Sequence, residues 1–280
     1  MPRFRTSDAT FNYIDEGAGI PLAFQHGLGG DIGQPKTFVV PGVRLLSFDA
    51  RGHGGTIALL DPERLTFSSF ADDLCSLLDH LTIHAAVIGG ISMGAGVALN
   101  FALRFPDRAL GLILCRPAWL HERSPKNLQV YPQIASLIQH EGVIKGRTLF
   151  ENYELFQQIR NQSVDSAHSL LRQFEREGAD RNFAVLDRMP KDVPNNDPAD
   201  WKTIRVPTLI LGNRQDPIHP IEYAQLLSSL ITSSTFNEVT SKSIDPVAHV
   251  KEVVTAISLF FQRRSLAGAA KRRTLRSDAG

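Results

Sequence analysis

The sequence predicts a doubly wound, mostly parallel α/β sheet with an inserted helical segment. Short, continuously apolar runs alternate along the chain with segments in which apolar residues recur at helical spacing. Continuous rather than alternating apolar character is typical of parallel strands that are buried on both faces. Helices that alternate with such strands cover the two faces of the sheet. The pattern is interrupted once, between residues 119 and 201, where helical windows follow one another without a buried strand.

The individual elements follow from this pattern in chain order. A hairpin is expected at the start of the chain, where residues 11–14 follow a short polar turn. The runs with the length and composition of buried strands are residues 21–25, 43–48, 86–89, 110–115 and 208–211. The segments with a helical apolar stripe are residues 67–81, 97–105 and 247–262. Together they predict one α/β core that comprises residues 1–118 and 202–262.

Residues 119–201 are expected to form a helical cap on this core. They contain amphipathic windows at 134–138, 149–159 and 169–174, and they return to the core through a proline-rich stretch at 189–200. A helical segment of this length between two strands is expected to sit at one edge of the sheet, where it shapes the pocket for a ligand.

The charge of the chain is divided unevenly. The 280 residues carry a net charge of +1, but residues 263–280 alone carry +5 and residues 1–262 carry −4. Because this body has no excess of cations, binding of nucleic acid along its length is not expected. The basic tail has no core-facing pattern and is predicted to be a solvated, disordered extension, for which a weak polyanion-binding role stays open.

Cysteine and apolar content indicate the compartment. Cys75 and Cys115 are the only cysteines, and neither lies in a C-x-x-C pair, so a disulfide scaffold or a zinc finger is not expected. The N-terminal residues lack the apolar region of a signal peptide, and no uncharged run approaches the length of a membrane span. We therefore expect a soluble cytoplasmic protein that is a monomer or a homodimer.

The sharpest functional signal is Gly90-Ile91-Ser92-Met93-Gly94, which lies between a buried strand and a helix. A serine on such a tight turn is held in a strained backbone with its hydroxyl exposed, and small residues two positions before and after it let the chains pass. The N-terminus of the following helix presents the backbone N–H of Met93 to a developing oxyanion. Ser92 is therefore the predicted nucleophile.

A second glycine-rich stretch, His26-Gly27-Leu28-Gly29-Gly30, directly follows a predicted strand. Glycines allow this loop to fold over the carboxyl edge of the sheet, where ligands bind in open α/β folds. The backbone N–H of Leu28 is the predicted second donor to the oxyanion. The ring of His26 is expected to hold the loop in place rather than to transfer a proton.

A serine hydroxyl needs a base, and the base needs an orienting acid. Asp216 immediately follows a buried strand and is the predicted acid. Its rival Asp245 lies four residues before His249 and is expected to help to cap the helix instead. His249 lies in a loop at the start of the last helix and is the predicted base, with His219, just past a strand end, as its rival. The chain order Ser92, Asp216, His249 is the order expected for one hydrolase architecture.

Together these residues resemble the α/β-hydrolase superfamily over residues 10–262. Residues 49–54, with the sequence DARGHG, are similar to the D-x-R-G-H-G motif of that superfamily, in which the Arg and His organise a loop, so no catalytic role is carried onto Arg51 or His53. Within the superfamily the chain most resembles the capped, esterase-like branch that includes 3-oxoadipate enol-lactonases. A serine nucleophile implies acyl transfer, whereas an aspartate would imply attack on haloalkanes or epoxides.

Arg116 is a further candidate because it follows a predicted strand at its carboxyl end. It is expected to face the same crevice as Ser92, where a guanidinium can bind a substrate carboxylate through two parallel hydrogen bonds. The alternatives are a pair with an acid of the cap or a position that faces solvent.

These observations predict a serine-dependent hydrolase that cleaves an ester or lactone of a small organic molecule through an acyl-enzyme, without a metal or an organic cofactor. Cleavage of a thioester or an amide stays open. Two alternatives from other classes also stay open. One is a receptor-like binding module that keeps Ser92, Asp216 and His249. The other is a cofactor-free lyase or oxygenase, in which His249 is the base and Ser92 only positions the substrate.

Overall fold

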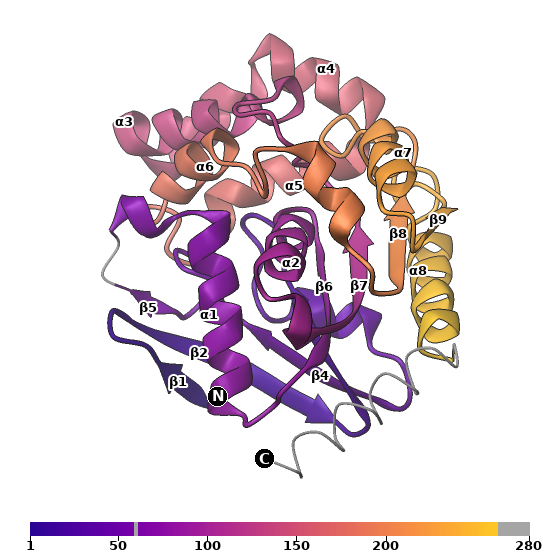
Figure 1. The fold of residues 1–280 in the computed structure, drawn as a ribbon. Helices are drawn as coiled ribbons and strands as arrows, with labels where there is room; N and C mark the ends of the chain where they lie inside the picture. Colours follow the sequence, from indigo (N-terminus) through magenta and orange to yellow (C-terminus); the bar gives the residue numbers. More distant parts are fainter. Residues whose placement is uncertain (59–60, 263–280) are drawn as a thin grey trace, which may run out of the picture.

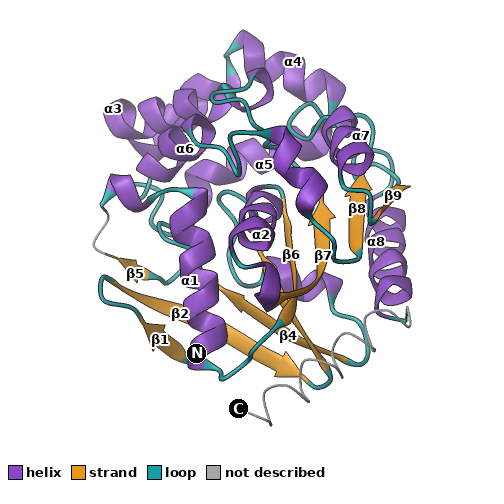
Figure 2. Ribbon diagram, in the orientation of Figure 1, coloured by secondary structure: helices purple, strands orange, loops and turns teal. Residues whose placement is uncertain are grey.

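The computed structural model describes residues 1–58 and 61–262, and the predicted basic tail, residues 263–280, lies outside them. The described strands form one sheet in the order β1-β2-β4-β3-β6-β7-β8-β9, with β5 paired to β2 (Figure 2). The strands are β1 Arg3–Arg5, β2 Ala9–Gly17, β3 Ile20–Gln25, β4 Val43–Phe48, β5 Ile57–Ala58, β6 Ala86–Ile91, β7 Ala109–Cys115, β8 Thr208–Gly212 and β9 Ser234–Glu238. Every neighbouring pair from β4 to β9 is parallel, whereas β2 runs antiparallel to β1, β4 and β5. The predicted mostly parallel sheet is therefore confirmed.

Helices cover both faces of the sheet (Figure 1), and the buried side chains of the central strands alternate between two hydrophobic cores. The helices outside the insertion are α1 Phe67–His80, α2 Met93–Arg104, α7 Ile221–Leu230 and α8 Pro246–Phe261. On β3, Ala23 belongs to the core that includes α1, α2 and α7, whereas Leu22 and Phe24 belong to the core that includes α8. Leu112 and Ile113 of β7 divide in the same way. Burial on both faces explains why these strands read as continuous apolar runs.

The helical insertion lies between β7 and β8. Its α-helices among the described residues are α3 Val130–Glu151, α4 Glu154–Gln162, α5 Val164–Glu175 and α6 Ala184–Arg188. Figure 1 shows them gathered at the end of the sheet toward which β7 and β8 point. The carboxyl ends of the parallel strands meet at that edge, which is where ligands bind in open α/β sheets. In the described part of the chain, no helix has both the length and the apolar character needed to cross a membrane.

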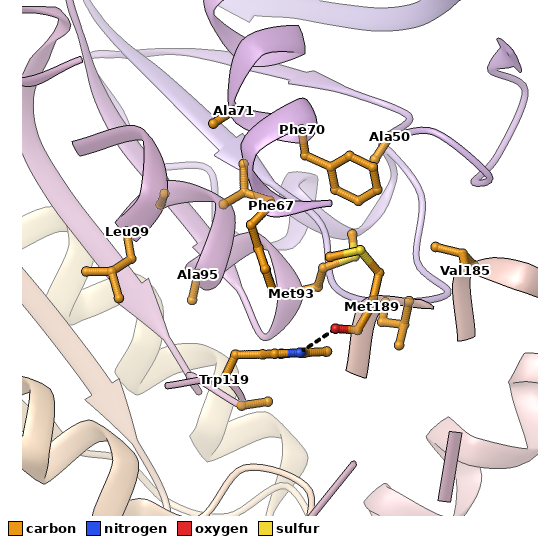
Figure 3. Close-up of a cluster of buried hydrophobic side chains, with 14 of the residues drawn as sticks. Ala50, Phe67, Phe70, Ala71, Met93, Ala95, Leu99, Trp119, Val185 and Met189 are labelled. Atoms are coloured by element: carbon orange, nitrogen blue, oxygen red, sulfur yellow. Dashed lines mark hydrogen bonds between the residues drawn. The ribbon is translucent and has the colours of Figure 1, made fainter. Parts of the chain in front are cut away.

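The insertion is anchored in the core beside α1 and α2. Trp119 is buried at its start, and the indole N–H donates a hydrogen bond of 2.9 Å to the carbonyl oxygen of Met189 near its end (Figure 3). The Trp119 ring meets Phe67 of α1 edge-on, with ring centroids 5.6 Å apart. Met93, the first residue of α2, lies in the same cluster. The insertion therefore packs directly against the helix that follows the Gly90–Gly94 turn.

Among the elements that differ from the prediction, two do so for reasons that the structure identifies. α2 begins at Met93, four residues before the predicted stripe, because Gly94, Ala95 and Gly96 contribute no large apolar side chains. A Cβ at Gly96 would lie 2.4 Å from the ring of Phe67, so glycine allows α1 and α2 to pack closely. β9 lies outside the predicted strands because its residues are only partly buried at the edge of the sheet.

Candidate active site

Ser92 occupies the turn between β6 and α2. Its backbone φ of 57° lies in the left-handed region, which costs a non-glycine residue about 1–3 kcal/mol. The neighbouring chains enforce this conformation. A Cβ at Gly90 would lie 2.2 Å from the backbone of Gly94, and a Cβ at Gly94 would lie 2.1 Å from the carbonyl oxygen of Gln25. Both positions therefore require glycine, and the turn holds Ser92 at the carboxyl end of a central strand.

Hydrogen bonds join Ser92 to a histidine and an aspartate of one loop. The Oγ atom of Ser92 lies 2.9 Å from Nε2 of His219. The Nδ1 atom of His219 lies 2.9 Å from Oδ1 and 3.0 Å from Oδ2 of Asp216. The backbone N–H of His219 also donates to Oδ1 of Asp216 at 3.2 Å. Because both residues lie in the short connection between β8 and α7, this turn folds the ring back onto its own acid and directs Nε2 toward Ser92.

The expected placement of His249 beside Ser92 is corrected by the structure. His249 lies in the first turn of α8 and is 1% exposed, and its Nδ1–H donates a hydrogen bond of 2.7 Å to the carbonyl oxygen of Thr240. Among the described residues, no hydrogen bond joins it to Ser92 or Asp216. Burial lowers the pKa of His249 to about 4, against the opposing effect of the Thr240 carbonyl. His219, the rival in the sequence, takes the expected position.

Asp245 also has a structural task. Its side chain accepts hydrogen bonds of 2.9 Å from the backbone N–H groups of Val247 and Ala248. This is the geometry of an N-cap, which satisfies two donors of α8 that have no partner within the helix. The expectation that Asp245 helps to cap the helix is therefore confirmed, and the same cap fixes the first turn of α8, where His249 lies.

The expected role of Arg116 as a substrate cation is also corrected. The guanidinium is 7% exposed and donates from Nε at 2.9 Å and from Nη2 at 2.5 Å to Oδ2 of Asp216. The Nη2 atom also donates to Oδ2 of Asp165 in α5, at 3.2 Å. The alternative that Arg116 pairs with an acid of the insertion is therefore confirmed for Asp165. Arg116 is engaged by two carboxylates, so it is a partner of Asp216 rather than a free cation.

Asp216 is the buried centre of this network. Its Oδ1 atom accepts a hydrogen bond of 3.1 Å from the hydroxyl of Ser166, in the first turn of α5. Burial alone would raise the pKa of Asp216, but the charge of Arg116 and the hydrogen bonds from Arg116 and His219 outweigh it and hold that pKa well below its ordinary value. Asp216 is therefore ionised. The insertion supplies two members of the network, Asp165 and Ser166, which sequence reasoning did not identify because nothing in the chain order brings α5 to β8.

Strained backbone recurs at the neighbouring strand ends. Arg116, at the end of β7, has a φ of 47°, and Gln215, which precedes Asp216, has a φ of 54°. Because β6, β7 and β8 are adjacent in the sheet, the left-handed residues Ser92, Arg116 and Gln215 lie at three successive strand ends. Clusters of such residues are typical of active sites and ligand sites, where the surrounding structure holds functional groups in place.

The ring of His219 is arranged to accept a proton. Burial lowers its pKa below the ordinary value, the charge of Asp216 opposes this shift, and Arg116 adds to it. The ring is therefore neutral at pH 7. Because Nδ1 donates to the ionised Asp216, Nε2 is the nitrogen with a free lone pair, and it faces the hydroxyl of Ser92.

This lowered pKa predicts the pH dependence of catalysis. A base must be unprotonated, so kcat/KM falls when the pH drops through the pKa of the base in the free protein. We expect the acid limb of kcat/KM for a neutral ester to lie below about pH 6.5, the ordinary value for a histidine. A profile between pH 4 and 9 measures it. A limb at pH 7 or above would contradict the burial of a neutral His219.

Met93 directly follows Ser92, and the loop that contains Leu28 lies beside the same turn. Met93 is the first residue of α2, so its N–H has no acceptor within the helix. In the loop that contains Leu28, the N–H of Gly27 donates to Oε1 of Gln34 at 2.7 Å and the N–H of Gly29 donates to Nε2 of His53 at 2.9 Å. The loop lies against the nucleophile turn, because a Cβ at Gly27 would be 3.3 Å from that of Ser92.

Histidines and charged groups around this loop have structural partners. The Nδ1–H of His26 donates to the carbonyl oxygen of Gly27 at 2.8 Å, and its Nε2 accepts the N–H of Ala50 at 3.0 Å. His26 thus ties the loop to the DARGHG segment, as the sequence predicts. The guanidinium of Arg51 is buried and binds the carboxylates of Asp8 and Asp73. In the described residues, no group of three or more His, Cys, Asp or Glu side chains is placed to hold a metal ion.

Comparisons with known proteins agree with this architecture. The sequence profile of the alpha/beta hydrolase fold family matches residues 20–250. The chain is 24% identical over 265 residues to 3-oxoadipate enol-lactonase 2 of Acinetobacter baylyi, an alignment that covers 91% of this chain and 92% of the relative. A solved structure of a thermophilic esterase from Thermogutta terrifontis is similar with a TM-score of 0.73 at 23% identity, and the match covers 94% of this chain and 98% of that one. The enol-lactonase from Burkholderia xenovorans is similar with a TM-score of 0.71 at 19% identity, over 94% of this chain and 100% of that one.

Proposed function

Because the chain belongs to the alpha/beta hydrolase fold family, we propose that it is a serine hydrolase that cleaves an ester or lactone of a small organic molecule. The observation that supports this most strongly is the hydrogen-bonded series Ser92–His219–Asp216, with 2.9 Å from Oγ to Nε2 and 2.9 Å from Nδ1 to the carboxylate. A nucleophile, a base and an orienting acid in contact are the requirements for acyl transfer through a covalent intermediate.

In the first half of the reaction, Oγ of Ser92 attacks the carbonyl carbon while Nε2 of His219 accepts the hydroxyl proton. Asp216 holds the ring through Nδ1 and stabilises its charged form. The protonated His219 then gives this proton to the leaving oxygen, the C–O bond breaks, and the alcohol departs from the acyl-enzyme. For a lactone, the alcohol remains attached to the acyl group.

In the second half, His219 removes a proton from water, and the oxygen of that water attacks the acyl carbon. The bond to Oγ of Ser92 then breaks, and His219 returns the proton to Oγ. The balance is one ester and one water consumed for one acid and one alcohol formed. The N–H groups of Leu28 and Met93 are the proposed donors to the oxyanion in both halves, a contribution worth about 3–4 kcal/mol per donor in other hydrolases.

The similarity to an enol-lactonase and to an esterase supports a hydrolase that acts on small esters. The insertion suits the role of a cap, because α5 supplies Ser166 and Asp165 to the surroundings of Asp216. A cap that contacts the acid can shape the pocket and exclude water from it at the same time.

Turnover of a series of p-nitrophenyl esters, combined with labelling by a fluorophosphonate, tests this proposal. We expect hydrolysis of at least one ester and a covalent adduct on Ser92, identified by mass spectrometry of its peptide. A ligand that raises Tm without turnover and without an adduct would instead favour the receptor-like module. Turnover of a substrate without an adduct on Ser92 would favour a lyase or oxygenase.

Arg116 is proposed as a positioning residue that acts through Asp216. Arg116→Met removes a charge that lowers the pKa of His219, so we expect the acid limb of kcat/KM to move to higher pH and kcat to fall by about tenfold or more because the acid is less firmly held. Arg116→Lys, which keeps the charge, should restore most of the limb. Arg123→Met, at an exposed arginine of the insertion, is the control. A loss of thermal stability with an unmoved limb would show that Arg116 is merely structural.

A further inference from the structure

A cavity of about 510 Å³ lies beside the proposed site, between the loop that contains Leu28 and the helix α5. Its walls include Leu28 and Gly29 from the loop, and Arg172 and Gln173 from α5. Arg176, which follows α5, and Lys242, which lies between β9 and α8, also line it. A cavity of this size suits a small organic ligand.

One face of α5 connects this cavity to the hydrogen-bonded series. The hydroxyl of Ser166 donates to Asp216, and seven residues later Gln173 donates from Nε2 to the carbonyl oxygen of Leu28 at 3.3 Å. Residues three, four or seven positions apart lie on the same face of a helix. The same face of α5 therefore contacts the acid and the proposed oxyanion loop, and that loop is also a wall of the cavity.

Three cations of the cavity have no carboxylate partner. Among the described residues, no Asp or Glu oxygen lies within ion-pair distance of Arg172, Arg176 or Lys242. The guanidinium of Arg176 donates only to backbone carbonyl oxygens, those of Gly52 at 3.1 Å and Asn182 at 2.7 Å. Its Nε atom is buried without a hydrogen-bond partner. A half-buried cation without a counter-charge is costly unless a ligand supplies one.

The acids that line the cavity are exposed, and two of them interact with groups other than the three cations. Asp31, Glu175 and Glu177 are all exposed, whereas Arg176 and Lys242 are half-buried. Asp31 accepts the N–H of Gly33, and Glu175 pairs with Arg147 on the outer surface of the insertion. The inner part of the cavity is therefore positively charged.

We propose that this cavity is a subsite for an anionic group of the substrate, a carboxylate or a phosphate, held by Lys242 and Arg176 while Ser92 attacks the ester at the other end of the molecule. The inference rests on the proposed serine hydrolase and names its substrate class, an ester or lactone with a second, anionic group. Arg172, at the exposed mouth, adds to the attraction of an anion. Arg116 takes no part in this subsite, because Asp216 and Asp165 already engage it.

The ionisation of these cations agrees with the geometry. Burial lowers the pKa of Arg176 to about 10. Burial, together with the charge of Arg116, lowers the pKa of Lys242. Both shifts have the sign that burial gives to a cation, and a bound anion would oppose them.

Matched esters test the subsite in the full-length protein. The anionic series consists of the monomethyl esters of the linear C4 to C8 diacids, and each has a neutral partner in which an isopropyl group replaces the carboxylate. A third series carries a terminal phosphate and distinguishes the two anions. Release of acid is followed by titration at constant pH. For at least one chain length we expect kcat/KM to favour the anionic ester by about tenfold or more.

Two variants assign that preference. Lys242→Met and Arg176→Met should each reduce the ratio of kcat/KM between the anionic and neutral esters by about fivefold or more. Lys251→Met, at an exposed lysine of α8, is the matched control and should keep the ratio. Equal kcat/KM for both series at every chain length, or a ratio unaffected by both variants, would overturn the subsite. Hydrolysis of the neutral esters by the unaltered protein would then still support the serine hydrolase, whereas its failure on every ester would contradict that proposal itself.

Discussion

Ser92→Ala is expected to lower kcat for any ester substrate by about 10⁴- to 10⁶-fold. The substitution removes the oxygen that forms the acyl-enzyme, and no other hydroxyl accepts a hydrogen bond from, or donates one to, Nε2 of His219 in the described residues. Residual turnover would come only from binding and from the N–H groups of Leu28 and Met93. Steady-state rates with a p-nitrophenyl ester and with an alkyl ester measure the loss.

Ser136→Ala is the matched control for this prediction. Ser136 lies on α3 and is exposed, so the same loss of a hydroxyl should leave kcat within about twofold. Circular dichroism of both variants establishes that they are folded. If Ser92→Ala kept a tenth or more of the activity, an acyl-enzyme on Ser92 would be excluded, and a reaction in which Ser92 only positions the substrate would take its place.

His219→Gln is expected to lower kcat by about 10³-fold or more, because glutamine can accept a hydrogen bond but cannot carry the proton between nucleophile and leaving group. His249→Gln should keep kcat within about threefold, since the ring of His249 is bound to Thr240 and not to Ser92. His249→Gln is still expected to lower the free energy of unfolding by about 1–3 kcal/mol, because a buried hydrogen-bond donor is disturbed.

The two histidines are therefore distinguished by which variant loses kcat and which loses only stability. Chemical denaturation gives the free energy of unfolding of each variant, and initial rates give kcat. A large loss of kcat in His249→Gln together with full activity in His219→Gln would show that His249 is the base. Equal losses in both would indicate that the two rings exchange roles during turnover.

Most of the fold could be predicted from the sequence because parallel strands leave a strong pattern. The β4 strand Val43–Phe48 has the predicted bounds, and β3, β6, β7 and β8 extend the predicted runs by one or two residues. Their burial on both faces produces uninterrupted apolar runs. The sequence does not predict β9, because an edge strand with half-exposed side chains has no continuous apolar run.

The nucleophile turn could be predicted because its constraints are local. Gly90, Ser92 and Gly94 are close in sequence, and the glycines are needed by backbones that lie within the same turn or directly beside it. The acid can be predicted for a similar reason, since Asp216 follows a buried strand closely in the sequence. The positions of these residues in the fold therefore depend mainly on the sequence next to them.

The base and the partners of the acid depend on contacts that the chain order does not reveal. The position of His249 at the start of the last helix can be predicted, but the partner of its ring cannot: Nδ1 is bound to the carbonyl oxygen of Thr240 and not to Asp216. A signal for His219 exists in the sequence: it lies three residues after Asp216, within reach of a turn. No comparable signal joins Arg116 to Asp216, because that contact spans two strand ends.

The rate of covalent labelling shows whether His219 activates Ser92. The unaltered protein, His219→Gln and His249→Gln are each treated with the same fluorophosphonate, and the adduct on the Ser92 peptide is followed by mass spectrometry over time. We predict that His219→Gln slows labelling by about 10²-fold or more, whereas His249→Gln is labelled within about threefold of the unaltered rate. Labelling that is lost in His249→Gln and kept in His219→Gln would show that His249, and not His219, activates Ser92.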